Sequence, residues 1–143
     1  MSSPPSKADF ERLSHFRYRL RCYLRTSEDL CQAEGVTLLQ YQLLLHVMGF
    51  PDREWATVGE IAERLQAKQH GVVALLDRCE KLDLVQRRPS QADRRQVEIH
   101  LQPKGRELVS RLAAAHRSEL ELLQREFMLP GWAQAQQTRS GDA

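Results

Sequence analysis

The sequence predicts a mostly α-helical fold with one small β-hairpin. Residues 84–101 hold two short runs of alternating apolar and polar side chains around a polar loop, which is typical of a hairpin. Two short helical patterns precede it, at 57–65 and 68–82, and longer amphipathic patterns lie towards both ends of the chain. Two short helices, a tight turn between them and a following hairpin are the parts of a winged helix-turn-helix. We therefore expect that fold over about residues 37–101, flanked by longer helices.

Composition and charge are those of one globular domain with local basic segments. The chain has 143 residues, of which 41% are hydrophobic and 28% charged, and its formal net charge is only +2. However, residues 86–106 hold six Lys or Arg against two acids, and residues 12–25 hold five Arg and no acid. Basic segments in a nearly neutral chain indicate a surface that faces a polyanion.

Cysteine usage and hydropathy predict a cytoplasmic protein that has no membrane partner. The three cysteines, Cys22, Cys31 and Cys79, include no closely spaced pair, so no disulfide framework is expected. Residues 1–6 lack the apolar core of a signal peptide. The longest apolar run, near residues 43–50, is too short to cross a bilayer.

The N-terminal third predicts an arm and two helices. Residues 1–7 are expected to form a disordered arm rich in Ser and Pro. Apolar residues then recur at spacings of three and four over residues 8–33, which predicts an amphipathic helix that ends at Gly35. Thr37-Leu-Leu-Gln40 has the pattern of a capping box and opens a second helix, which Gly49 stops.

A second capping box opens the helix pair before the hairpin. Thr57-Val-Gly-Glu60 starts a short third helix, and a fourth follows at about residues 68–82. The spacing of its apolar residues places these side chains towards the core: Val72, Leu75, Leu76, Cys79 and Leu82. The opposite face carries His70, Ala74, Asp77 and Lys81, with Gln69 and Val73 at its margin.

Pro103 suits the first turn of a fifth helix, which we expect to continue to residue 129. Residues 130–143 then form a short polar tail. The helices at 8–34 and 103–129 carry apolar stripes longer than a small winged helix can cover, which predicts that they pair with the same helices of a second copy. The alternative is that both helices cover the core of a monomer.

Taken together, these motifs resemble the MarR family of dimeric winged-helix transcription regulators. The resemblance covers about residues 10–127, so that residues 8–129 would form the MarR-like domain. The matching segments are Thr57-Val-Gly-Glu-Ile-Ala-Glu-Arg-Leu65, Leu75-Leu-Asp-Arg78, Leu84-Val-Gln-Arg-Arg88, Asp93-Arg-Arg95 and Leu101-x-x-Lys-Gly-Arg-x-Leu108.

The resemblance implies a homodimer that binds double-stranded DNA at a pseudo-palindromic operator and acts as a repressor without a cofactor. A small aromatic ligand would release the DNA, and Tyr23, Tyr41 and His46 are candidates for lining its cleft. No nucleophile elbow, P-loop or GxGxxG pattern is present, so we do not expect an enzyme. The five histidines lack metal-ligand spacing, so no metal is expected.

The resemblance also implies which residues meet DNA. Arg95 would enter the minor groove, whose negative potential attracts a guanidinium, and Asp93 would brace the loop. The other three wing arginines would contact phosphates. The first residues of the fourth helix would approach base edges, where Gln can pair with adenine. The implied DNA-binding residues are Gln69, His70, Val73, Ala74, Arg87, Arg88, Asp93, Arg94 and Arg95.

The sequence departs from the family pattern at three places, of which the apolar Val73-Ala74 pair and the missing last helix favour an alternative function. Val73 and Ala74 stand where the family usually has polar or basic residues, Asp83 replaces the usual Gly before the wing, and residues 132–143 hardly supply the family's last apolar helix. The alternative is a winged-helix dimer for protein interaction in which DNA binding is weak or lost. Redox sensing by Cys22 or Cys31 is a second, less favoured alternative to structural cysteines.

Overall fold

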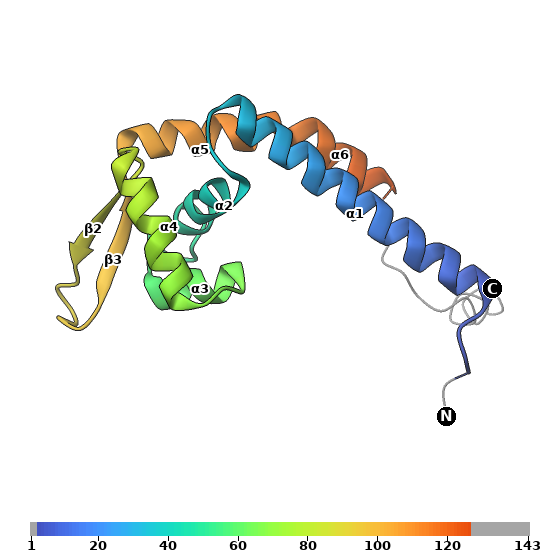
Figure 1. The fold of residues 1–143 in the computed structure, drawn as a ribbon, viewed down its shortest axis with the longest axis horizontal. Coiled ribbons are helices and arrows are strands. Elements are labelled where there is room, and N and C mark those ends of the chain that lie inside the picture. The colour runs from blue at the N-terminus through green and yellow to red at the C-terminus, as the bar shows by residue number, and fades with distance from the viewer. Residues whose placement is uncertain (1–2, 127–143) are drawn as a thin grey trace. The chain divides into compact units, whose positions relative to one another are not determined.

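The computed structural model describes residues 3–126 and confirms the predicted fold class (Figure 1). Its elements in chain order are α1 (Lys7–Ala33), α2 (Leu38–Met48), β1 (Trp55–Thr57), α3 (Val58–Leu65), α4 (Gln69–Lys81), β2 (Val85–Pro89), β3 (Val97–Leu101), α5 (Pro103–Ala115) and α6 (Arg117–Glu126). The three strands form one antiparallel sheet in the order β1-β3-β2. Among the described residues, no helix combines the length and apolarity needed to span a bilayer.

The chain divides into two compact units. The helical unit comprises Met1–Ser27 and His116–Ala143, of which residues 3–27 and 116–126 are described. The winged-helix unit comprises Glu28–Ala115 and contains α2 to α5 with the sheet.

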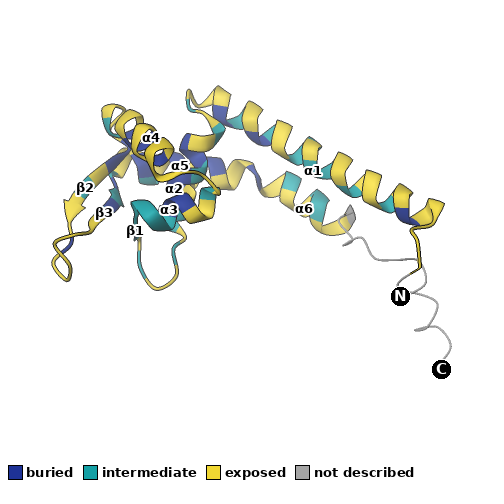
Figure 2. Ribbon diagram, turned by 60° about the horizontal axis from the view of Figure 1, so that its bottom comes forward, coloured by how far each residue is buried: buried dark blue, intermediate teal, exposed yellow. Residues whose placement is uncertain are grey.

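The core of the winged-helix unit lies between α2, α3, α4, α5 and the inner face of the sheet. Figure 2 shows the buried residues of these elements in dark blue. The largest side chains with almost no exposed surface include Leu43, Leu44, Ile61, Leu76 and Ile99. Fully burying one such side chain stabilises a fold by about 1.5–3 kcal/mol, so this cluster holds α4 against the sheet.

Both predicted capping boxes are present. The Thr37 hydroxyl accepts a hydrogen bond from the Gln40 amide at 3.1 Å, and the Gln40 side chain accepts one from the Thr37 amide at 2.9 Å. Thr57 and Glu60 form the same reciprocal pair, at 3.3 and 3.0 Å. Each box satisfies amides that have no partner within the helix, which fixes where α2 and α3 begin.

A third reciprocal cap opens α1, and the sequence reasoning missed it. Asp9 accepts hydrogen bonds from the Ser6 amide at 2.8 Å and from the Ser6 hydroxyl at 2.9 Å. The Ser6 hydroxyl in turn accepts one from the Asp9 amide at 3.2 Å. Ser6 falls within the predicted disordered arm, but its side chain caps the first turn of α1.

The short strand β1 was not predicted. It pairs with β3, so that Trp55 lies opposite His100 and Thr57 opposite Glu98. Three residues, of which Thr57 already opens the capping box, are too few to show an alternating pattern, and the pairing partner is some forty positions away in the sequence. Tertiary pairing with β3 therefore creates this strand.

The expected single helix over residues 103–129 is wrong within the described range. Helix α5 ends at Ala115, and α6 resumes at Arg117. The interruption falls at His116, which is 1% exposed and lies 2.7 Å from the Ser27 hydroxyl through its Nε2 atom. The spacing of apolar residues continues through this point without a Pro or Gly, so periodicity could not reveal it. Residues 127–129 lie outside the described residues.

Leu82, which the helical spacing places on the core side of α4, and Val97, the first residue of β3, are both partly exposed. Leu82 is 38% exposed and Val97 is 41% exposed. Leu82 is the C-terminal cap of α4, where the chain turns away from the helix axis. Val97 pairs with Pro89 at the end of the hairpin that is distant from the core. Helical or strand periodicity gives the direction of a side chain but not where the core ends.

Asp83 occupies the left-handed turn that closes α4. Its φ is 58°, and the amides of Asp83 and Leu84 donate to the carbonyls of Glu80 and Cys79 at 2.9 and 3.0 Å. A side chain in this conformation is strained where glycine is not. We expect Asp83→Gly to raise the free energy of unfolding in urea by about 1 kcal/mol. Asp83→Asn removes the charge but keeps the Cβ atom, so it should raise the free energy of unfolding by less. An equal rise in both variants would show that charge, and not the backbone conformation, causes the effect.

Glu60 makes the stability of the α3 cap depend on pH. Burial alone would raise the pKa of its carboxyl, but hydrogen bonds from Thr57 and the nearby Arg53 guanidinium outweigh burial and lower the pKa. A lowered pKa in the folded state stabilises the fold above the pKa of the unfolded group, about 4.3, and this stabilisation is lost as the pH falls.

We therefore expect Glu60→Gln to lower the free energy of unfolding at pH 7 and to have a smaller effect in acid. Urea unfolding of both proteins at neutral pH and near pH 3 measures the difference. A cost of the substitution that stays constant over this range would contradict the ionised cap.

Candidate nucleic-acid interface

Helix α4 has one buried and one exposed face. Val72, Leu75, Leu76 and Cys79 are buried in the core, as predicted. The exposed side chains are Gln69, His70, Val73, Ala74, Asp77, Arg78 and Lys81, of which Val73 is 42% exposed. This surface, here called the α4 face, therefore combines an amide, an imidazole, two small apolar groups and one carboxylate with two cationic side chains in its last turn.

A tight turn sets α4 against α3. Gln66 caps α3 in the left-handed region with φ 51°, and its amide bonds to carbonyls of that helix. The Ala67 amide donates to the Ala62 carbonyl at 2.9 Å, and α4 begins two residues later. The two helices are thus joined by three residues, which is the connection of a helix-turn-helix.

The wing is the β2–β3 hairpin with an ordered tip. The Ser90 amide donates to the Gln96 carbonyl at 3.1 Å, and the Gln96 amide donates to the Asp93 carbonyl at 3.0 Å. The Asp93 carboxylate accepts a hydrogen bond from the Arg95 amide at 3.0 Å. The buried Ser90 hydroxyl also accepts one from the Asp93 amide at 3.2 Å. Asp93 therefore braces the backbone of the tip, and Ser90 is an anchor that the sequence pattern shows only as a loop residue.

Three wing arginines are exposed. The Arg88 guanidinium lies 3.3 Å from the Gln86 side-chain oxygen, and Arg88 stands opposite Glu98 across the hairpin. Within residues 3–126, neither Arg94 nor Arg95 forms an ion pair. The tip therefore presents two cationic side chains to solvent on a backbone that its own hydrogen bonds hold in place.

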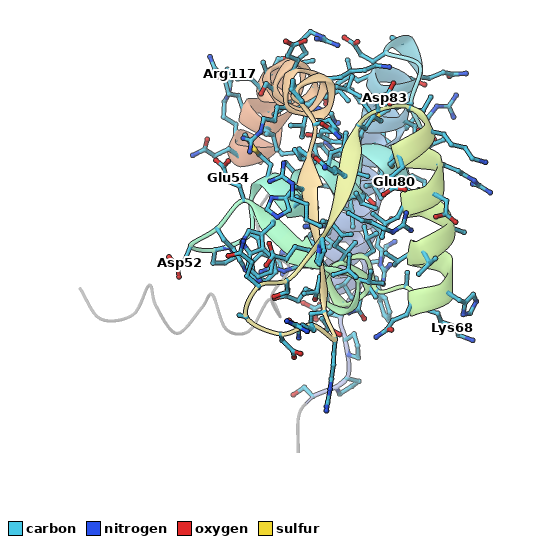
Figure 3. The ribbon with its side chains drawn as sticks, turned by 90° about the vertical axis from the view of Figure 1, so that its left-hand side faces the viewer. Asp52, Glu54, Lys68, Glu80, Asp83 and Arg117 are labelled. Carbon is cyan, nitrogen blue, oxygen red and sulfur yellow. The ribbon has the colours of Figure 1, made fainter. Side chains whose placement is uncertain are left out.

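Arg87 has a different environment. Its guanidinium donates to the Glu80 carboxylate at 2.6 Å and to the Asp77 carboxylate at 2.8 Å, and its side chain is 29% exposed. Figure 3 shows α4 from the side, with Lys68 labelled at its start and Glu80 near its end. The sequence placed Asp77 on the exposed face of the helix but did not predict that Asp77 and Glu80 pair with Arg87, although their spacing of three on one helix was a usable signal.

The face of the sheet that points away from the core carries a cluster of aromatic and charged side chains. The Trp55 and His100 rings stack at 6.2 Å, and His100 Nε2 lies 2.9 Å from the Glu98 carboxylate. The Arg53 guanidinium lies over the rings of Trp55 and Phe50, at 3.9 and 4.2 Å from their centroids. These contacts hold the segment before β1 against β3.

The predicted effector residues differ in environment. Tyr23 belongs to the helical unit, where its ring meets His116 edge-on at 6.1 Å and burial raises the pKa of its phenol. Tyr41 is a core residue of α2 that is 6% exposed. His46 is half-buried, and burial together with the Arg64 charge lowers its pKa. Because Tyr41 and His46 are five positions apart, they leave α2 in different directions. The effector cleft remains a prediction.

The cysteines include two that are well protected. Cys31 and Cys79 are fully buried, and burial raises the pKa of both thiols, that of Cys79 to about 11. A thiol held in its protonated form is a poor nucleophile, which favours the structural interpretation for these two. Cys22 is half-buried. Among the described residues, no three His, Cys, Asp or Glu side chains are grouped so that they could hold a metal ion.

Comparison with known proteins supports the geometry. The model of the MarR family matches residues 34–96, which confirms the resemblance over the winged helix. AbsC, a MarR family transcriptional regulator from Streptomyces coelicolor, has a similar structure with a TM-score of 0.74 at 17% identity, over 90% of this chain and 86% of that one. The sequence matches none of the curated proteins with which it was compared.

Two further solved structures are similar in fold. Wild-type MarR from E. coli gives a TM-score of 0.68 at 17% identity and covers 89% of this chain and 88% of its own. A mutant of MepR from S. aureus, bound to an oligodeoxyribonucleotide, gives a TM-score of 0.64 at 20% identity, covering 89% of both chains. At these identities the likeness establishes the fold.

Proposed function

From a winged helix of the MarR family at residues 34–96, we propose that this chain is a homodimeric, sequence-specific DNA-binding transcription regulator, and more specifically a repressor that a small ligand releases. The main support for DNA binding comes from the wing tip. The hairpin tip holds Arg94 and Arg95 exposed and without ion pairs among the described residues, on the same winged-helix unit as the exposed α4 face. Unpaired guanidinium groups on an ordered ribbon fit the potential of a minor groove.

In the proposed complex, α4 of each protomer enters a major groove. Two copies would read half-sites about one helical turn apart in a pseudo-palindromic operator, with the wings in the flanking minor grooves. Gln69 is suited to adenine, whereas Val73 and Ala74 are suited to thymine methyl groups. Arg88 and Arg94 would contact phosphates, which position the protein without reading sequence.

The dimer is proposed from apolar surface on the helical unit. Phe10 and Tyr18 of α1 are 57% and 61% exposed, and Leu120 of α6 is 48% exposed. Phe10 and Tyr18 also help to line a hollow on α1 together with His15. Exposed apolar side chains at several positions of two helices are costly in water and typical of a surface that a partner covers. Sedimentation at several concentrations measures the oligomeric state.

The ligand-released repressor is the finer part of the proposal and rests on the family resemblance. Tyr23 and His46 remain candidates for contacting a small aromatic effector. Tyr41 is a weaker candidate because it lies in the core. Release of a bound duplex by candidate phenols, measured by fluorescence anisotropy, tests this part independently of DNA binding itself.

The alternative function is a winged-helix dimer for protein interaction with weak or lost DNA binding. Its specific support is the α4 face, where Val73 and Ala74 expose apolar surface at the position of a DNA-reading helix. The two functions differ in their response to salt, because a protein that neutralises phosphates releases counterions.

The decisive experiment is a salt titration of DNA binding. The wild-type protein is titrated with a random duplex and with duplexes from the DNA upstream of its coding region, starting near 50 mM salt. We expect the logarithm of affinity to fall linearly with the logarithm of salt concentration, and an upstream duplex to bind more tightly than the random one. Absence of any salt-dependent binding would favour the protein-interaction alternative.

A further inference from the structure

We infer that Arg87 is a positioning residue, which fixes the wing to α4 so that the tip arginines meet the DNA, and that it does not contact phosphate. This inference rests on the proposed DNA binding and changes the role that the family resemblance implies for Arg87. Its first support is the direction of the side chain. Arg87 lies opposite the buried Ile99 in the hairpin, so both side chains leave the sheet on the side of α4. Arg88, opposite Glu98, leaves on the other side.

The second support is the fit of the guanidinium to its partners. One terminal nitrogen donates to Glu80 at 2.6 Å and the other donates to Asp77 at 2.8 Å. A planar guanidinium with two diverging donors can bridge two carboxylates on one helix face, three residues apart. The short distances are those of charge-assisted hydrogen bonds. Arg87 thereby links β2 directly to the C-terminal half of α4.

The third support is electrostatic. One guanidinium and two carboxylates carry a formal charge of −1, so the group as a whole repels a phosphate at close range. A phosphate that approached Arg87 would also approach both carboxylates, whose two negative charges outnumber the single charge of the guanidinium. By comparison, Arg88 and Arg94 are exposed and have no carboxylate partner among the described residues.

The bridge has a mechanical consequence for the wing. Figure 1 shows β2 and β3 extending as a two-stranded ribbon past α4. Arg87 lies near the base of this ribbon, two residues after the buried Val85, whereas Arg95 lies at its far end. A small change of angle at the base moves the tip further than the base itself. Loss of the bridge should therefore reduce what Arg95 contributes to binding.

The first test compares salt dependence. Arg87→Ala and Arg88→Ala are titrated with the upstream duplex that binds the wild type. We expect Arg87→Ala to weaken binding about 3- to 30-fold with the salt slope unchanged. Arg88→Ala should reduce the slope by about 1, as loss of a phosphate contact does. A slope reduced equally by Arg87→Ala, or an unchanged affinity, would overturn the inference.

The second test is a double-mutant cycle between Arg87→Ala and Arg95→Ala. If Arg87 acts through the wing tip, the fold-loss of affinity caused by Arg95→Ala should be smaller in the Arg87→Ala protein than in the wild type. We expect the two fold-losses to differ by a factor of at least about 3. A merely structural role would lower the melting temperature but leave the two losses additive, and additive losses would refute positioning. Arg87→Gln, which keeps a hydrogen-bond donor on a shorter, uncharged side chain, repeats the cycle if Arg87→Ala does not fold. Failure of the wild type to bind any duplex would instead remove the proposed function.

Discussion

Arg95→Ala is expected to weaken binding of the upstream duplex by about 1–3 kcal/mol, which is roughly 5- to 150-fold. The side chain is exposed at the wing tip, and its own amide is held by the Asp93 carboxylate at 3.0 Å. Because this backbone is already ordered, the guanidinium would enter a minor groove with little further loss of conformational entropy. Because the residue is exposed, its truncation should leave the free energy of unfolding nearly unchanged.

Arg111→Ala is the matched control for this experiment. It removes the same charge from an exposed position on α5, where the guanidinium lies 3.3 Å from Glu34 and has no proposed DNA contact. Titrations of both variants with the same duplex and salt series separate a specific contact from a general loss of positive charge. Equal affinities of the two variants would remove Arg95 from the interface.

The composition of the α4 face gives the wing an unusual share of the proposed binding. Val73 and Ala74 can contact a thymine methyl group but cannot donate or accept a hydrogen bond at a base edge. Asp77 on the same face is bonded to Arg87. At the first turn of α4, where the helix would approach base edges, the exposed polar side chains are thus limited to Gln69 and His70. The protein would then distinguish one DNA sequence from another more by A·T-rich segments and the width of the minor groove than by hydrogen bonds to base edges in the major groove.

Much of the fold could be predicted because local signals agree with it. The two threonine capping boxes and the apolar spacing of α4 depend on residues within one or two turns, and the structure has them as expected. Strand β1 and the break at His116 depend on partners distant in the sequence, namely β3 and Ser27. Periodicity carries no information about such partners.

The candidate site divides in the same way. The exposure of Arg88, Arg94 and Arg95 follows from a polar hairpin tip and could be anticipated. The sequence could not distinguish Arg87 from Arg88, because alternation along a strand separates their directions but does not say which face meets α4. The three-dimensional position of Asp77 and Glu80 decides that question.

Gly105→Ala is expected to destabilise the fold by about 3 kcal/mol or more, the upper part of the range for forcing an extra methyl group into a packed site. Gly105 is buried in the first turn of α5, and a Cβ atom there would lie 2.2 Å from the Leu84 carbonyl oxygen and 3.0 Å from its carbon. Both are backbone atoms, so no side-chain rotation can relieve the overlap.

The Leu84 backbone is also held in place on both sides. Its amide donates to the Cys79 carbonyl at 3.0 Å, and its carbonyl accepts from the Gln102 amide at 2.9 Å. Moving it away from a new methyl group would disturb the end of α4, the start of β2 and the approach to α5 together. A buried carbonyl that loses its donor adds a penalty of about 1–3 kcal/mol to the steric cost.

Gly71→Ala is the matched control, since Gly71 is also helical but a Cβ atom there meets nothing within 4 Å. Alanine is favoured over glycine within a helix by about 1 kcal/mol, so this variant should be as stable as the wild type or more stable. Urea unfolding of the three proteins should therefore show that the same glycine-to-alanine substitution changes the free energy of unfolding with opposite signs at the two positions. If Gly105→Ala were as stable as Gly71→Ala, then α5 would not pack closely on Leu84, and the rigid connection between α4, the wing and α5 would have to be abandoned.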